Sequence, residues 1–98
     1  MQTETEIQKA AQRGIDAKAL LESPLLAESF GRLKQTYIDQ LMATDVTQSE
    51  LRDRCWLAAR VVDVVRDHLT KVVNDGVVAQ SDLDRLAKEA QRKKRFGL

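Results

Sequence analysis

The heptad spacing of apolar residues within residues 51–72 limits the fold of this chain more than any other feature. Apolar side chains recur at intervals of 4, 3, 4, 3, 4 and 3 residues, at Leu51, Cys55, Ala58, Val62, Val65, Leu69 and Val72. On a helix that turns by about 100° per residue they share one side, as in a coiled coil. A second stripe runs beside this seam and consists of Leu57, Val61, Val64 and His68. The two stripes cover about half of the helix, which predicts two packing partners, the second being another copy of the chain.

Local start and stop signals divide the chain into four expected helices. These helices span about residues 4–22, 24–43, 48–74 and 82–95. Thr3 and Glu6 have the spacing of a capping box, and so do Thr47 and Glu50. The first helix has only a weak apolar stripe, so its first turns are expected to fray.

Proline and glycine set two of the expected boundaries. Pro24 disfavours helix in the residue before it but suits the first turn of a new helix, with Ser23 as the cap. Gly76 follows Asn74 and Asp75, and it is expected to end the third helix as a left-handed cap. A short link over residues 77–80 then leads to the fourth helix.

The expected fold is all-α, in a single domain over residues 1–98. The second helix has one continuous apolar stripe, formed by Leu26, Phe30, Leu33, Tyr37 and Leu41. It is expected to form an antiparallel hairpin, about 24–43 with 48–74, with a short helix on each side, and oligomerisation completes the core. Residues 1–22 form a partly frayed helix in this interpretation, and residues 91–98 form a basic flexible tail.

Composition narrows the class of protein. The chain is 43% hydrophobic and 32% charged, as in a folded protein rather than a disordered one. Its one cysteine excludes an internal disulfide, and no apolar run approaches the roughly 18–20 residues of a membrane span. Without a recognisable signal peptide, the cytoplasm or a larger particle assembled there is the expected location, with no membrane partner.

Trp56, the one tryptophan, is predicted to lie on the polar side of the third helix. Arg52 and Arg60 flank it at one turn in each direction, so their guanidinium groups can stack on the indole ring. Three interpretations stay open. The first or fourth helix covers the ring, or the three side chains form a contact surface for a protein partner. The third is stacking of a small molecule or nucleotide.

No catalytic or metal-binding pattern is present, so the chain is predicted not to be an enzyme and to use no cofactor. Cys55 lies on the apolar seam and is expected to be a buried core residue. His68 is more than three helical turns away from it, too far to act as its base, and is expected at a boundary between helices. Asp63 and Asp67 are expected to form ion pairs with bases on their own helix.

The C-terminal segment is basic although the net charge is only +1. Residues 51–98 have eleven bases and seven acids (11 − 7 = +4), whereas residues 1–50 have five bases and eight acids (5 − 8 = −3). Four consecutive bases, Arg92, Lys93, Lys94 and Arg95, can neutralise phosphates without reading sequence. The competing interpretation is a solvated helix end, where the helix dipole favours basic residues.

Residues 19–80 resemble a family of small all-helical proteins encoded in tailed bacteriophages and prophages. The resemblance begins at Leu-Leu-x-x-Pro-Leu-Leu (residues 20–26), with aromatic residues at Phe30 and Tyr37. It continues through Glu50, Arg52, Arg54, Trp56, His68, Leu69 and Gly76. The resemblance implies a phage setting rather than a mechanism, because these proteins are largely uncharacterised.

The sequence therefore predicts a non-enzymatic phage interaction or assembly protein that self-associates. The expected oligomer interface consists of Leu51, Ala58, Val62, Val65, Leu69 and Val72. A phage or host protein would bind at Arg52, Trp56 and Arg60, and no small-molecule substrate is expected. One alternative is a nucleic-acid accessory module of DNA packaging that uses Arg92, Lys93, Lys94 and Arg95. Another alternative is a phage inhibitor of a host protein.

Overall fold

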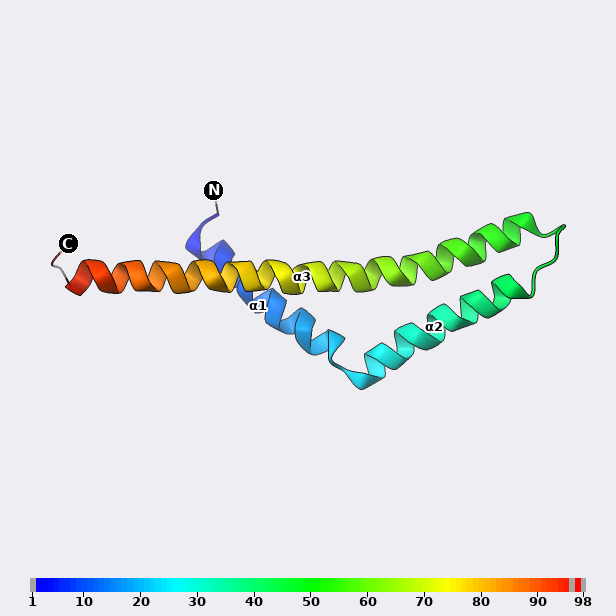
Figure 1. The fold of residues 1–98 in the computed structure, drawn as a ribbon, viewed down its shortest axis with the longest axis horizontal. Coiled ribbons are helices and arrows are strands. Elements are labelled where there is room, and N and C mark those ends of the chain that lie inside the picture. Colours follow the sequence, from blue (N-terminus) through cyan, green and yellow to red (C-terminus); the bar gives the residue numbers. More distant parts are fainter. Residues whose placement is uncertain (1, 96, 98) are drawn as a thin grey trace. The chain divides into compact units, whose positions relative to one another are not determined.

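A computed structural model describes residues 2–95 and Gly97. It contains three helices, α1 (Glu4–Leu21), α2 (Pro24–Met42) and α3 (Ser49–Arg95), and no strand among the described residues (Figure 1). The all-α prediction is confirmed. α1 and α2 begin and end within about one residue of the expected positions, because short-range signals set those ends.

The main correction concerns α3, which does not end at Gly76. α3 is one helix of 47 residues, so the expected link at 77–80 is helical and the expected fourth helix is the C-terminal part of α3. Among the described residues, positive φ occurs only at Gly97. Gly76 is buried and faces Gly14 of α1, where a Cβ atom would lie 2.6 Å from the Gly14 Cα atom. Gly76 is thus needed for close helix contact and not for a turn.

The described residues form two compact units, which are treated separately below. Residues 2–18 belong with 70–95, which we call the α1 unit, and residues 19–69 form the α2 unit. The prediction of one domain remains a prediction.

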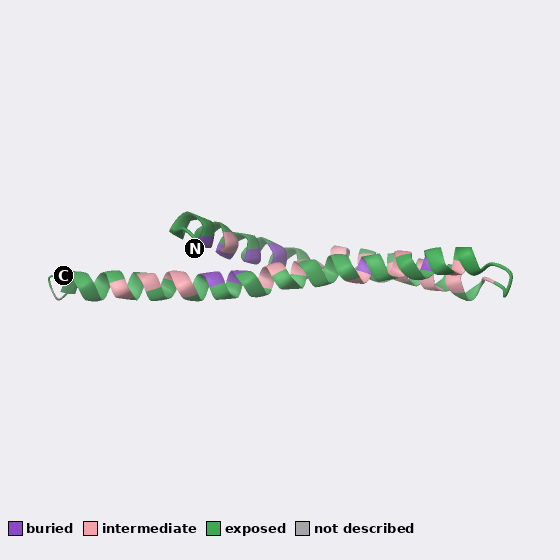
Figure 2. Ribbon diagram, turned by 90° about the horizontal axis from the view of Figure 1, so that it is seen from above, coloured by how far each residue is buried: buried purple, intermediate pink, exposed green. Residues whose placement is uncertain are grey.

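In the α1 unit, α1 packs against the C-terminal part of α3 through alanine, isoleucine and leucine side chains. Ile7, Ala11 and Ala79 are its buried cluster, and Ala10, Leu83 and Leu86 pack against that cluster. Buried turns of the two helices face each other (Figure 2). The capping box of α1 is confirmed, because the Glu6 N–H donates to Thr3 Oγ1 and the Thr3 N–H donates to Glu6 Oε2, each at 3.2 Å. Fraying of the first turns remains a prediction.

The α2 unit packs α2 against the N-terminal part of α3. Ser23 caps α2, since its Oγ atom accepts from the Leu26 N–H at 3.4 Å, and Pro24 occupies the first turn. Three contacts join the helices, and they pair Phe30 with Arg66, Lys34 with Asp63, and Gln40 with Cys55. Residue numbers rise along α2 as they fall along α3, so the helices run in opposite directions within this unit.

Candidate interaction surfaces

The predicted interface on α3 divides into buried and exposed positions. Cys55 and Val62 are buried, whereas Leu51 and Val65 are exposed. The remaining members are intermediate: Ala58, Leu69 and Val72. The burial of Cys55 is confirmed, and its thiol donates weakly to Gln40 Oε1 at 3.9 Å. α2 also contacts Asp63 and Arg66, so the packed side of α3 is rotated away from Val65. Leu51 lies on the same side as Val62 but in the first turn of α3.

The second apolar stripe of α3 is exposed. Leu57, Val61 and Val64 have exposed fractions of 56%, 51% and 52%, and Val65 beside them is exposed too. His68 continues this stripe and is also exposed, and its expected position at a boundary between helices stays a prediction. The α2 unit therefore leaves an apolar side of α3 uncovered.

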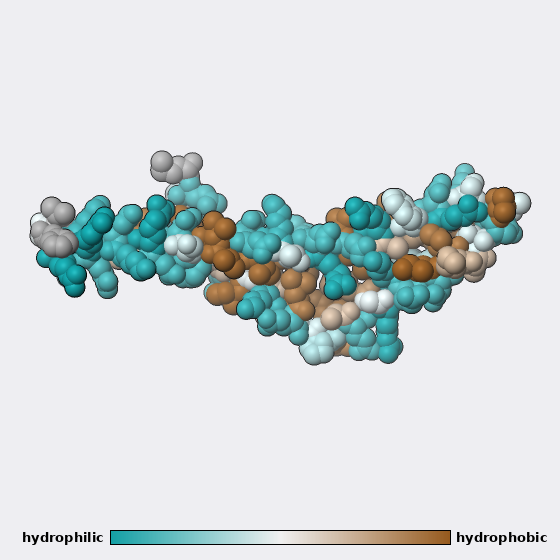
Figure 3. All heavy atoms as spheres, in the orientation of Figure 1, coloured by the Kyte–Doolittle hydropathy of each residue, from teal (hydrophilic) through white to brown (hydrophobic). Residues whose placement is uncertain are grey.

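Leu33 of α2 extends this apolar surface. The Lys34–Asp63 ion pair marks one edge of the contact between the helices. Leu33 lies about 100° around α2 from Lys34, and Val61 lies on the far side of buried Val62 from Asp63, so both are directed toward the other edge. We define the apolar face as the exposed residues Leu33, Leu57, Val61, Val64 and Val65. Apolar side chains are visible at the surface of the α2 unit in Figure 3.

The polar side of α3 carries an ion pair that the sequence analysis did not predict. Lys34 Nζ lies 2.9 Å from both carboxylate oxygens of Asp63, and both side chains are partly buried. Asp63 had been expected to pair with a base on its own helix, and that expectation is wrong. The two residues are 29 positions apart, and no local pattern could reveal their pairing.

Trp56 is 59% exposed, and α2, its neighbour within the α2 unit, does not cover its ring. Covering of the ring by the first or fourth expected helix stays a prediction, because those residues belong to the α1 unit. The described residues show a cation–π contact elsewhere, with the Arg66 guanidinium carbon 6.0 Å from the Phe30 ring centre. Arg52 does not stack on Trp56 but binds the loop between α2 and α3, where its Nη2 donates to the Asp45 carbonyl at 2.7 Å. Of the expected contact surface, Trp56 and Arg60 remain exposed.

The loop before α3 is organised around Asp45. Its carboxylate accepts hydrogen bonds from the Thr47 hydroxyl and from the Thr47 N–H, the latter at 2.8 Å. Gln48 Oε1 accepts from the Asp45 N–H at 3.0 Å. Thr47 was expected to form a capping box with Glu50, but α3 begins at Ser49, so Gln48 rather than Thr47 precedes the first helical residue. The Thr47 hydroxyl donates to Asp45 instead.

The Asp45 carboxylate provides a pH-dependence prediction. The hydrogen bonds from Thr47 lower the pKa of Asp45, with a smaller effect from the charge of Arg52. A lowered pKa in the folded state stabilises the fold above the unfolded pKa, about 3.9, and this contribution disappears as pH falls through the folded pKa. Thr47→Val should raise the pKa of Asp45 toward its ordinary value, as NMR titration of the side-chain carboxyl would show. An unchanged pKa would contradict this role of Thr47.

The predicted basic segment lies at the end of α3. Arg92, Lys93, Lys94 and Arg95 form the last turn of the helix and are exposed. Residues 91–95 are thus helical, whereas Phe96 and Leu98 of the predicted flexible tail lie outside the described residues. The predicted flexibility itself is not tested.

Within residues 2–95 and Gly97 no group of three or more His, Cys, Asp or Glu side chains is placed to hold a metal ion. No helix in the same residues is long and apolar enough to cross a membrane. The surfaces available to a partner are therefore the apolar face, the surroundings of Trp56 and the basic end of α3.

Comparisons with models of protein families, with curated proteins and with solved structures give no match for this chain.

Proposed function

We propose that this chain is a non-enzymatic interaction or assembly protein of a phage, which self-associates through the apolar face. The observation that carries the proposal is that the α2 unit exposes more apolar side chains than it buries. Its buried apolar side chains, among the described residues, are Cys55 and Val62, whereas five Leu and Val side chains lie exposed along one surface. A unit with so little buried surface gains stability when a partner covers it.

A second copy of the chain is the partner that the apolar face fits best. A twofold dimer brings the same surface of each copy together, so one self-complementary patch is enough. Covering a half-exposed Val or Leu contributes about 1 kcal/mol, and ten such side chains from two copies contribute on the order of 10 kcal/mol. The cost of association is about 4–15 kcal/mol. We therefore expect association that depends on protein concentration.

The phage setting of the proposal rests on the resemblance in residues 19–80. In that setting the protein would act in the host cytoplasm or inside an assembled virion. Trp56 and Arg60 supply a second surface on α3, beside the apolar face, where a phage or host protein would bind. Exposed Trp and Arg side chains are frequent anchors of protein interfaces.

The mass of the protein in solution tests self-association directly. Light scattering behind a sizing column should give a multiple of the 11.1 kDa chain mass, and the value should fall toward 11.1 kDa on dilution. A mass of one chain at every concentration would contradict the proposal. It would favour the alternative in which the apolar face binds a different protein, as an inhibitor of a host protein would.

A further inference from the structure

The continuation of α3 past Gly76 places basic residues on one fixed helix face. Arg85, Lys88, Arg92 and Arg95 follow one another at intervals of 3, 4 and 3 residues. At about 100° per residue they fall within about 80° of the helix circumference, a strip that we call the basic face. The four cations span about 15 Å along the helix axis, at 1.5 Å per residue.

The basic face is on the side of α3 opposite to α1. The residues that contact α1 from this part of the helix are Gly76, Ala79, Leu83 and Leu86. Their mean direction is about 180° from that of the basic face. Within the α1 unit the cations are therefore left to solvent, and all four are exposed. Figure 3 shows this end of α3 as hydrophilic on the side in view.

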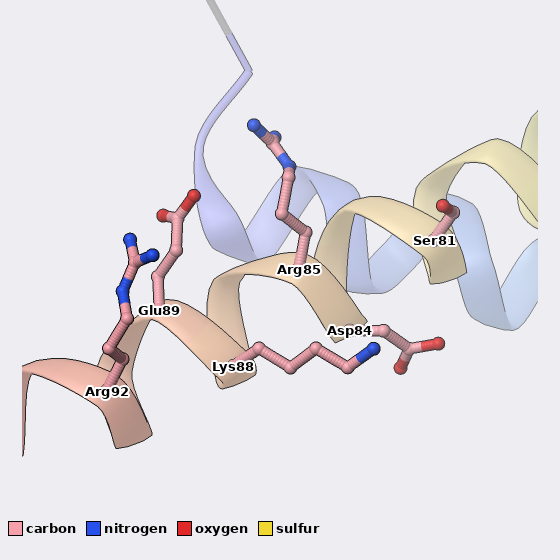
Figure 4. Close-up of a pocket in the computed structure, with 6 residues that line it drawn as sticks. All are labelled: Ser81, Asp84, Arg85, Lys88, Glu89 and Arg92. Carbon is pink, nitrogen blue, oxygen red and sulfur yellow. The ribbon is translucent and has the colours of Figure 1, made fainter. Parts of the chain in front are cut away.

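Few acidic groups neutralise these cations. Residues 85–95 contain six bases and one acid, Glu89, which gives +5 (6 − 1). Arg85 lies 3.8 Å from Asp82, a long and exposed contact, whereas the described residues hold no ion pair to Lys88, Arg92 or Arg95. In Figure 4 the Lys88 side chain extends along the helix toward Asp84, and the Arg92 side chain lies beside that of Glu89. The uncompensated charge is therefore greatest toward Arg95.

A nucleic-acid backbone is the polyanion that suits this face. Double-stranded DNA presents one negative charge per about 1.7 Å of axis, so cations about 4.5–6 Å apart find phosphates in any register. Residues 77–95 contain no aromatic side chain that would stack on bases. Insertion into a membrane surface needs an apolar side beside the cations. Leu86, the one large apolar residue within residues 85–95, packs against α1, whereas the exposed Val77 and Val78 lie about two turns before Arg85.

We propose that the basic face of α3 binds the phosphate backbone of nucleic acid without reading its sequence. The face extends the basic cluster at residues 92–95 by Arg85 and Lys88, which the continuous helix aligns with it. The proposal does not depend on self-association, because the apolar face lies in the α2 unit and the basic face in the α1 unit.

The test uses the full-length protein and a fluorescent DNA duplex of random sequence, with anisotropy measured as salt rises from about 50 to 200 mM. Four phosphate contacts predict a log–log salt slope of about −3.6, or an affinity loss of about 150-fold over that range. The double substitution Arg92→Gln and Arg95→Gln should halve the slope to about −1.8, or about a 12-fold loss.

The matched control is Lys9→Gln with Arg13→Gln, which removes two exposed cations from α1. This control should keep the slope of the wild type, which would show that local position rather than net charge matters. Equal slopes in the two double variants would overturn the proposal. The proposal would also be overturned if the protein bound anionic phosphatidylserine vesicles but did not bind the duplex. Circular dichroism separates binding from a structural role, because a cation that only stabilises the helix end changes helicity and leaves the salt slope unchanged.

Discussion

Gly76→Ala should lower the free energy of unfolding by about 2 kcal/mol, although alanine is the better helix former. An added Cβ atom would lie 2.6 Å from Gly14 Cα and 3.2 Å from the Ala10 carbonyl oxygen. Both neighbours are backbone atoms, which cannot move aside by a side-chain rotation, so the two helices must separate. Overpacking of this kind destabilises a fold by up to about 3 kcal/mol. The higher helix propensity of alanine offsets about 1 kcal/mol of that loss.

The same measurement contains a matched control at Gly31. This glycine lies in α2, is exposed, and has no atom within 4 Å of the position that a Cβ would occupy. Gly31→Ala should therefore stabilise the protein by about 0.5–1 kcal/mol. Urea unfolding followed by circular dichroism would compare the variants. Gly14→Ala should also lower the free energy of unfolding, because a Cβ atom at either glycine would lie 2.6 Å from the Cα atom of the other. Stabilisation by Gly76→Ala would contradict the close helix contact.

The sequence predicts the ends of helices well where the signal is local. It predicts them wrongly where one residue type, such as glycine, can have either of two structural roles. Ser23 and Pro24 act on their immediate neighbours, so their meaning survives whatever packs around them. Gly76 is different. Glycine permits both a left-handed cap and close contact between helices, and only the position of Gly14 across the α1 unit decides between them. That contact joins residues 62 positions apart (76 − 14), beyond any local signal.

The candidate surfaces show the same division. The heptad pattern correctly predicts that Cys55 is buried, and Val62, expected in the oligomer interface, is buried beside it. It does not determine which flank of the seam faces α2, because that depends on the Lys34–Asp63 pair and on Arg66 over Phe30. Asp63 and Arg66 lie on the flank of α3 that faces α2, and Val65 lies on the opposite flank and is exposed. The sequence therefore predicts how wide the apolar arc of α3 is, but it does not predict which half of that arc α2 covers.

Val61→Lys is the substitution that should weaken self-association most cleanly. Val61 lies within the apolar face between Leu57 and Val64, and it is half exposed in the α2 unit. A lysine there keeps the helix, since lysine is a better helix former than valine. In a twofold dimer the change occurs twice, and each copy must desolvate a charge against apolar side chains. A loss of about 3 kcal/mol corresponds to a dissociation constant at least about 100-fold weaker.

Val46→Lys provides the control for charge and residue type. Val46 is 90% exposed in the loop between α2 and α3, so the same substitution there should leave the mass in solution unchanged. Leu69→Lys is a poorer test, because Leu69 is half-buried and its replacement would also disturb the protomer. Light scattering on the two valine variants at matched concentrations separates the outcomes. If Val61→Lys keeps the mass of the wild type, the apolar face does not form the oligomer, whereas a one-chain mass for Val61→Lys alone assigns the interface to this face.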